Sequence, residues 1–112
     1  MAFHINGTLL EACVLSLLER GDMYGYKLTL DLKEAVDISE STLYPVLRRL
    51  QKNELLTTYD IPFQGRNRRY YKIALKGHEQ LQLYREEWKH YQSNISYILS
   101  PLLFESGKTN EV

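Results

Sequence analysis

The sequence predicts a mainly helical fold with one small β-hairpin, followed by a long helix near the C-terminus. In the first half of the chain, three segments place apolar residues at the three- and four-residue spacing of helices. Two shorter runs rich in β-branched and aromatic residues then flank a turn that contains Pro and Gly. The last segment repeats apolar residues in alternating steps of three and four. At 112 residues, the chain has room for one domain of ordinary size.

The first helix is expected over residues 8–20. Thr8 and Glu11 fit a capping box, in which a threonine side chain and an acid three residues later satisfy each other's backbone N–H groups. Gly21 is expected to end the helix. The apolar face holds Leu10, Cys13, Val14, Leu17 and Leu18. The thiol of Cys13 is expected to be buried rather than reactive, because reactivity needs exposure and a cationic neighbour.

A second helix is expected to begin with Asp22 as its cap and to run to about Glu34. Apolar residues recur every four positions at Tyr24, Leu28 and Leu32. The alternation typical of a strand is also present, at Tyr26, Leu28, Leu30 and Leu32. We predict a helix, because residues 33–35 continue it naturally.

A third helix is expected to be capped by Ser39 or Ser41. Its buried face follows the spacing i, i+3, i+4 and i+7, at Leu43, Val46, Leu47 and Leu50. The opposite side carries Ser41, Thr42, Pro45, Arg48, Arg49 and Lys52. Pro45 removes one backbone hydrogen bond of the helix, and its ring is expected on the outer face.

A strand is expected over residues 55–59 and a return strand over residues 68–73, with Pro62 and Gly65 marking the turn. Alternation puts one set of side chains on one face of the return strand, namely Arg69, Tyr71 and Ile73. The other face holds Arg68, Tyr70 and Lys72. The result is a hairpin with a basic tip.

From about Leu75 the chain is expected to be helical again, as far as Ser100. The apolar residues of this helix form a heptad seam, consisting of Leu81, Tyr84, Trp88, Tyr91, Ile95, Ile98 and Leu102. A helix of about 26 residues is about 39 Å long, which is more than a small domain needs for its own core. The helix can pack on the first helix or form a dimer through the seam. We favour the dimer, because exposed aromatic residues along the seam would promote aggregation.

The net charge of zero is distributed unevenly along the chain. Residues 1–37 hold three Lys and Arg against six Asp and Glu, a net charge of −3. Residues 38–77 hold eight against three, a net charge of +5, and residues 78–112 hold three against five, a net charge of −2. A basic island of this kind is typical of a nucleic-acid binder, although a solvated basic face would have the same composition.

The sequence contains no pattern typical of an enzyme or a metalloprotein. We find no nucleophile with a base and an orienting residue, no phosphate loop and no paired carboxylates. The three histidines His4, His78 and His90 lack the spacing of metal ligands, and no cofactor is expected. The sequence has neither an apolar run long enough to span a membrane nor a signal peptide, so we expect a cytoplasmic protein without a membrane partner.

Three helices, a hairpin and a long helix follow the order of a winged helix-turn-helix domain. The last helix of a helix-turn-helix enters the major groove of DNA. We predict such a domain over residues 1–74, a dimerisation helix over residues 75–104 and a tail over residues 105–112. The first turns of the third helix are expected to meet base edges, and its later cations to meet phosphates. The candidate DNA-binding residues are Ser41, Thr42, Tyr44, Pro45, Arg48, Arg49, Lys52, Gly65, Arg66, Arg68 and Arg69.

Over roughly residues 8–100, the chain resembles the PadR family of bacterial transcriptional regulators. The resemblance is carried by Leu15-Ser16-Leu17-Leu18, by Gly21-Asp22-Met23-Tyr24-Gly25-Tyr26-Lys27-Leu28, by Ser41-Thr42-Leu43-Tyr44-Pro45-Val46-Leu47-Arg48-Arg49-Leu50, and by Gly65-Arg66 with Arg69-Tyr70-Tyr71-Lys72-Ile73. The short last helix, with Gly77-His78-Glu79 and Trp88, is similar to the small subclass that includes multidrug-binding repressors.

The resemblance implies a homodimer held by the last helix, with two winged domains on a palindromic operator of double-stranded DNA. It also implies a repressor, often of efflux or detoxification genes, that a small planar aromatic molecule releases. Tyr44 and Pro45 match the signature of the family's third helix, and Arg66 and Arg69 match its wing. Trp88 matches the aromatic residue that stacks on flat ligands between subunits in multidrug-binding relatives. The candidate ligand-binding residues are Trp88, Tyr84, Tyr91 and Ala12, and the seam supplies the dimerisation residues.

The chain departs from the pattern of the resembled family at two positions. The family usually has Gly where this chain has Glu54, and here Asn53 is expected to supply the left-handed residue after the third helix. The family usually has Thr where this chain has Ala74, so the last helix is expected to lack its side-chain cap. Trp88 is either a ligand platform or an anchor of the dimer core. We favour the anchor, because aromatic stripes on a helix are more often packing than binding.

Two classes of function follow from the sequence. The first is a homodimeric repressor whose operator affinity falls when a planar compound binds beside Trp88. An intermediate alternative is a DNA-binding regulator that no ligand controls. The second is a protein-interaction adaptor, in which the seam binds a helix of another protein and the basic island only improves solubility. Oligomeric state and DNA binding distinguish the two classes.

Overall fold

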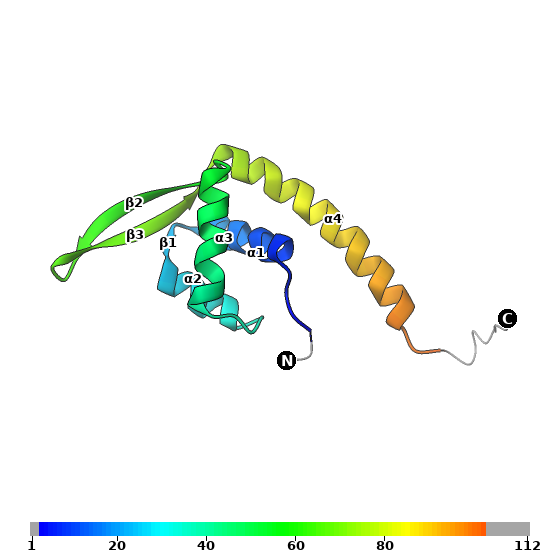
Figure 1. Cartoon of the computed structure of the whole chain (residues 1–112). Coiled ribbons are helices and arrows are strands. Elements are labelled where there is room, and N and C mark those ends of the chain that lie inside the picture. The colour runs from blue at the N-terminus through cyan, green and yellow to red at the C-terminus, as the bar shows by residue number, and fades with distance from the viewer. Residues whose placement is uncertain (1–2, 103–112) are drawn as a thin grey trace.

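Within residues 3–102, the part of the chain that the computed structural model describes, the fold consists of four helices and a small three-stranded antiparallel sheet. The hairpin of β2 and β3 extends to one side of the helices, and α4 extends to the other (Figure 1). In chain order the elements are α1 (Gly7–Arg20), β1 (Met23–Tyr24), α2 (Gly25–Lys33), α3 (Glu40–Lys52), β2 (Leu56–Phe63), β3 (Arg66–Ile73) and α4 (Leu75–Leu99). The predicted fold class, mainly helical with a small β-hairpin and a long C-terminal helix, is confirmed. The predicted tail, residues 105–112, lies outside the described residues.

The N-terminal cap of α1 differs from the predicted one. Asn6 is the N-cap, and its side-chain oxygen accepts a hydrogen bond from the backbone N–H of Leu9 at 2.8 Å. The capping box predicted for Thr8 and Glu11 is therefore wrong. Because Asn6 satisfies the free N–H by itself, the side chain of Glu11 is free to point into the protein, where it is only 8% exposed. Gly21 ends the helix, as predicted.

Helix α2 begins at Gly25, so the predicted start at Asp22 is wrong. Residues 23–24 instead form β1, a short edge strand that pairs with β3. Asp22 accepts a hydrogen bond from the hydroxyl of Tyr59 at 2.6 Å and caps no helix. The helical prediction for this ambiguous segment is confirmed, and the helix buries Gly25, Leu28, Thr29 and Leu32.

Strands β2 and β3 form a long hairpin, which we call the wing. They pair residue by residue along their whole length. The turn consists of Gln64 and Gly65, whose φ values of 50° and 84° are left-handed and match the twist of a two-residue hairpin. Pro62 was predicted in the turn, but it lies inside β2 opposite Asn67. A proline is tolerated there because β2 is an edge strand.

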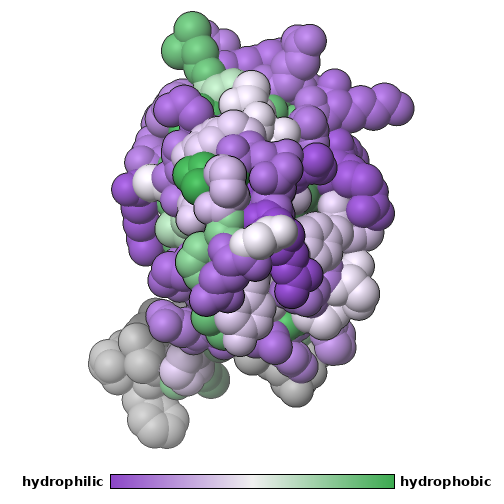
Figure 2. All heavy atoms as spheres, turned by 90° about the vertical axis from the view of Figure 1, so that its left-hand side faces the viewer, coloured by the Kyte–Doolittle hydropathy of each residue, from purple (hydrophilic) through white to green (hydrophobic). Residues whose placement is uncertain are grey.

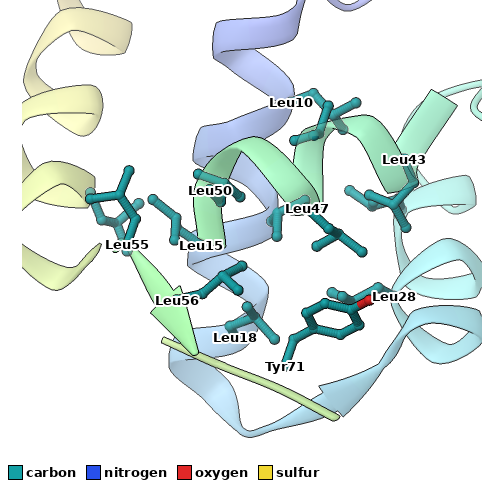
Figure 3. Packing of buried hydrophobic residues seen from close by; sticks show 14 of the residues in the cluster. Leu10, Leu15, Leu18, Leu28, Leu43, Leu47, Leu50, Leu55, Leu56 and Tyr71 are labelled. Carbon is teal, nitrogen blue, oxygen red and sulfur yellow. The ribbon is translucent and has the colours of Figure 1, made fainter. Parts of the chain in front are cut away.

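The core lies where α1, α2, α3 and the base of the wing meet (Figure 3). It consists mainly of leucines, joined by Tyr71, and includes Leu10, Leu15, Leu18, Leu28, Leu43, Leu47, Leu50, Leu55 and Leu56. The buried face predicted for α3 is confirmed. Cys13 is half-buried rather than fully buried. Burial raises the pKa of its thiol, which disfavours the reactive thiolate.

Two short connections join the wing to the helices, one from α3 to β2 and one from β3 to α4. After α3, the left-handed residue is Glu54 with φ of 65°, so the prediction that Asn53 would supply it is wrong. As predicted, Ala74 gives α4 no side-chain cap. Its backbone N–H instead donates to the carbonyl oxygen of Leu55 at 3.0 Å, which ties the start of α4 to the start of β2.

Helix α4 packs on α1 through its first half and then extends away from the rest of the protein (Figure 1). Leu81 is buried, and Arg85 donates to Glu19 at 2.9 Å and to Ser16 at 3.1 Å. Among the described residues, no helix is long and apolar enough to cross a membrane. Within residues 3–102, no group of three or more His, Cys, Asp or Glu could hold a metal ion.

Gly77, in the first turn of α4, leaves no room for a side chain. A Cβ added there would lie 2.0 Å from the carbonyl oxygen of Leu55 and 2.9 Å from the side chain of Ile73. We expect Gly77→Ala to lower the free energy of unfolding by about 1–3 kcal/mol, because α4 must move off the start of β2. Chemical denaturation measures this change.

Gly21→Ala is the matched control for Gly77→Ala. A Cβ at Gly21 would meet nothing within 4 Å. We expect this variant to stay within about 0.5 kcal/mol of the parent protein. Equal stability of the two variants would contradict the packing described for Gly77.

Candidate nucleic-acid interface

The outward face of α3 carries hydroxyl groups at its N-terminal end. Ser39 is the N-cap residue, one of the two predicted alternatives, but its hydroxyl caps no backbone N–H. The hydroxyl oxygen of Ser39 lies 2.9 Å from that of Ser41 and 3.3 Å from that of Thr42. Hydroxyl groups both donate and accept hydrogen bonds. This end of α3 can therefore match either kind of polar group on a base edge.

Pro45 lies near the same end of α3. Its ring is on the exposed side of the helix, as predicted. Because proline has no N–H, the carbonyl oxygen of Ser41, four residues earlier, lacks its helical hydrogen bond.

Tyr44 points toward α2 rather than outward. A Cβ added at Gly25 would lie 2.4 Å from the hydroxyl oxygen of Tyr44, so its ring covers a position where only glycine fits. Burial, followed by the nearby charge of Glu40, raises the pKa of Tyr44. The Tyr-Gly-Tyr and Thr-Leu-Tyr-Pro motifs of the sequence are thus two sides of one packing contact.

The wing meets α3 around the buried ring of Tyr71. Burial raises the pKa of Tyr71, and the nearby positive charges of Arg69 and Arg48 oppose that shift. Both guanidinium groups therefore lie near the junction of the wing and α3. Arg69 also forms an ion pair with Asp60, at 3.5 Å. The alternation predicted for β3, with Arg69 and Tyr71 on one face, is confirmed.

The other two arginines of the wing have different surroundings. Arg66 is exposed, next to the turn of the wing. Arg68 lies on the face turned away from α3, where its guanidinium carbon is 3.9 Å from the ring centroid of Tyr24 and 3.7 Å from that of Phe63. Seen from the end that the wing occupies in Figure 1, the surface is mostly hydrophilic (Figure 2).

Arg49 pairs with α1, although its side chain stays 45% exposed. Its Nε donates to one carboxylate oxygen of Glu11 at 2.5 Å, and the hydroxyl of Tyr84 on α4 donates to the other at 2.9 Å. A buried carboxylate is tolerated when charged and polar partners compensate it. Burial, and then the hydrogen bond to Glu11, raises the pKa of Tyr84 to about 12. We call Glu11, Arg49 and Tyr84 the Glu11 hub.

Sequence reasoning missed this role of Glu11, although the sequence contained a signal for it. Glu11 shares the helical spacing of Val14, Leu15 and Leu18, which line the core. An acid on an apolar helix face needs a partner, because burying an unpaired charge is costly. The two partners themselves could not be identified from local spacing, since Arg49 and Tyr84 are 38 and 73 residues away.

The predicted DNA-binding residues therefore fall into three groups. The exposed parts of α3 and the wing hold Ser41, Thr42, Pro45, Arg48, Gly65, Arg66 and Arg69. A second group makes contacts within the protein and comprises Tyr44, Arg49 and Arg68. Lys52 is separate from both, at the C-terminal end of α3, where it lines a cleft with Glu54 and Lys76.

The four candidate ligand-binding residues, Ala12, Tyr84, Trp88 and Tyr91, line one cleft of about 260 Å³ between α1 and α4. The ring centroids of Trp88 and Tyr91 are 6.2 Å apart, and the rings are tilted by 41°. A neighbouring cleft of about 420 Å³ shares Ala12, Tyr84 and Trp88 with the first. The Glu11 hub therefore touches this region through Tyr84.

Most of the predicted heptad seam is exposed in the single chain. Leu81 is buried and Tyr84 is half-buried against α1. The remaining seam residues are between 37% and 81% exposed, and they are Trp88, Tyr91, Ile95, Ile98 and Leu102. An apolar stripe of this length marks a surface that another apolar surface covers.

Comparison with known proteins relates the chain to one family. Residues 14–83 match the family model described as the Transcriptional regulator PadR-like family. The uncharacterised protein X of Lysinibacillus sphaericus is 30% identical over 99 residues, which cover 83% of this chain and 90% of that protein. A Streptococcus mutans protein of known structure is 32% identical, with 100% of both chains covered and a TM-score of 0.81. A PadR-like transcriptional regulator from Bacillus cereus is 31% identical, with 84% and 94% covered and a TM-score of 0.75.

The Glu11 hub predicts how stability depends on Tyr84. Tyr84→Phe removes only the hydroxyl, and we expect a loss of about 1–2 kcal/mol at neutral pH, because the buried carboxylate loses one donor. The raised pKa stabilises the folded state below pH 10, and this contribution is lost as the pH rises toward 12. The unfolding free energy of the parent protein should therefore fall more steeply over this range than that of Tyr84→Phe.

Tyr97→Phe is the matched control, since it removes a hydroxyl from a side chain that is 83% exposed. We expect it to match the parent protein at neutral pH and across the alkaline range. Urea titrations at a series of pH values measure all three proteins. Parallel alkaline curves for the parent protein and Tyr84→Phe would show that the hydroxyl of Tyr84 contributes nothing through Glu11.

Proposed function

This chain belongs to the PadR-like family of transcriptional regulators, and we propose that it is a homodimeric repressor that binds a palindromic operator. Proteins of this family are DNA-binding regulators rather than enzymes. The observation that carries the proposal is the exposed polar face of α3, with its hydroxyl groups and Arg48, beside Arg69 of the wing. We assign DNA binding to residues 1–74 and dimerisation to residues 75–104. Operator binding places the protein in the cytoplasm of a bacterial cell.

The proposed DNA contacts are of two kinds, to base edges and to the phosphate backbone. Ser41, Thr42 and Pro45 lie at the end of α3 that enters the major groove, where the hydroxyls of Ser41 and Thr42 read base edges. Arg48 and Lys52 bind phosphates along the flanks of that groove. In the wing, Gly65 lets the backbone come close to the DNA, while Arg66 and Arg69 bind it directly.

Salt dependence of DNA binding tests these contacts. Each cation that neutralises a phosphate contributes about 0.9 to the slope of log K against log salt concentration. We expect the double variant Arg48→Gln, Arg66→Gln to bind duplex DNA more weakly, with a slope reduced by about 2 per protomer. Fluorescence anisotropy with a labelled duplex measures both quantities.

Lys89→Gln removes one exposed positive charge from α4, away from the proposed interface, and is the control for the double variant. Its affinity and slope should match those of the parent protein. A double variant that binds as tightly as the parent would refute the proposed contacts. Absence of DNA binding by the parent protein would favour the protein-interaction adaptor instead.

The exposed seam supports the proposed homodimer. Its outer half extends beyond the body of the protein and offers apolar residues at heptad spacing to a second copy. We expect Ile98→Glu to dissociate the dimer, because a charge in the seam would have to be buried without a partner. Leu83→Glu, at an exposed apolar position outside the seam, is the control. Sedimentation at equilibrium distinguishes monomer from dimer, and a dimeric Ile98→Glu would place the interface elsewhere.

We further propose that a planar aromatic compound binds beside Trp88 and releases the repressor from DNA. The cleft shared by Ala12, Tyr84, Trp88 and Tyr91 supports this proposal, because aromatic walls suit flat apolar ligands. A ligand that fits one arrangement of the two subunits better than the other shifts the population toward it. Efflux or detoxification genes are the targets that this kind of inducer suggests.

Trp88 is the single tryptophan of the chain, so its fluorescence reports on the cleft directly. We expect acridine orange or ethidium to quench it with saturation, and Trp88→Ala to weaken dye binding measured by anisotropy of the dye. The same dyes should lower the affinity of the parent protein for its DNA. Lack of quenching across a broad panel of planar dyes would leave a ligand-independent regulator, with Trp88 as an anchor of the dimer core.

A further inference from the structure

The outer half of the wing is a ribbon of only two strands. Strand β1 pairs with residues 70–71 of β3 alone, so within residues 3–102 no third strand lies beside residues 60–69. Two-stranded ribbons are marginally stable in water without additional packing. The position of the tip must therefore depend on side chains that connect it to the rest of the protein.

Such side chains lie on the face of the wing that is turned away from α3, which we call the outer wing face. Tyr59 and Tyr70 stack there, with ring centroids 5.6 Å apart and an interplanar angle of 10°. Tyr24 of β1 meets the edge of Tyr70, also at 5.6 Å. The hydroxyl of Tyr59 donates to Asp22 at 2.6 Å, which fixes this cluster to the chain just before β1.

Arg68 connects that cluster to the tip. Its guanidinium carbon lies 3.9 Å from the ring centroid of Tyr24 and 3.7 Å from the ring centroid of Phe63. Tyr24 belongs to the body of the protein, whereas Phe63 directly precedes the turn of the wing. Arginine suits this place because its planar guanidinium can be covered by aromatic rings on its flat surfaces.

We infer that Arg68 is a positioning residue, which holds the tip of the wing against the body of the protein instead of binding a DNA phosphate. Arg66 and Arg69, on either side of it in the sequence, are then the wing arginines that bind DNA. The inference rests on the proposed function, since the tip needs a fixed position only if it meets DNA beside α3. It also differs from the expectation from sequence, which counted every wing arginine as a DNA contact.

Amide hydrogen exchange of the free protein tests the positioning role without any DNA. Arg68→Lys keeps the charge but loses the flat group between the rings, and Phe63→Leu removes one ring and leaves every charge in place. We expect both variants to speed the exchange of hydrogen-bonded amides in residues 60–69 by about tenfold. Amides of α1 in the same samples report whether the core stays folded.

Arg66→Lys is the matched control, because Arg66 is an exposed arginine of the same strand. Its exchange over residues 60–69 should match that of the parent protein. Unchanged exchange in both Arg68→Lys and Phe63→Leu, with α1 protected, would overturn the positioning role. Faster exchange in Arg66→Lys as well would overturn it too, because the effect would not be specific to Arg68.

Duplex binding then separates positioning from direct contact. We expect Arg68→Lys and Phe63→Leu to weaken binding by a similar factor, without changing the slope of log K against log salt concentration. The two substitutions combined should weaken binding no more than either alone, because they disrupt one contact. An Arg68→Lys variant that binds like the parent protein, while Arg68→Gln lowers the slope by about 0.9 per protomer, would identify Arg68 as a phosphate contact instead.

Duplex binding and amide exchange distinguish a failure of the proposed function from a failure of the positioning role. If the parent protein does not bind duplex DNA at all, the proposed function is wrong, and the exchange measurement still decides whether Arg68 holds the tip. If the parent binds DNA and exchange is unchanged in the variants, the positioning role alone is wrong.

Discussion

One buried carboxylate, that of Glu11, sets the relative positions of three helices. It receives Arg49 from α3 and Tyr84 from α4 while it is itself part of α1. A buried charge is tolerated only while its partners remain in place. Moving α3 or α4 away from α1 would leave the carboxylate of Glu11 buried without one of its partners, which is energetically costly. Because α3 is the proposed reading helix and α4 the proposed dimer helix, the spacing of two reading helices in a dimer depends on this hub. Tyr84 also lines the cleft beside Trp88, so a compound bound there would act on the same group.

The distribution of cations shows why a net charge of zero is compatible with DNA binding. The basic island of residues 38–77 carries a net charge of +5, yet its cations do not all face the same way. Arg49 is exposed but paired with Glu11, and Arg68 lies between two rings. Arg48, Arg66 and Arg69 are exposed on α3 and the wing. The flanking segments carry net charges of −3 and −2, so the positive charge of the chain is concentrated in the basic island.

The features that could be predicted from the sequence are those set by local spacing. Apolar periodicity identified α1, α3 and α4, and alternation identified the two faces of β3. Local rules could not choose between Asn6 and a nearby threonine as the cap of α1, because both side chains can accept the same N–H. They could not find β1 either, since a two-residue strand exists only through its pairing with β3. The packing of Tyr44 on Gly25 and the pairing of Arg49 with Glu11 depend on partners far away in sequence, which no local pattern reveals.

We propose that the protein meets DNA with the N-terminal part of α3 and the tip of the wing. The most direct test is the map of amide chemical-shift changes in the isotope-labelled protein on addition of a duplex. We expect the largest changes in residues 40–48 and 64–69, with small changes in the outer half of α4. Changes concentrated in α4, with α3 and the wing unaffected, would contradict it.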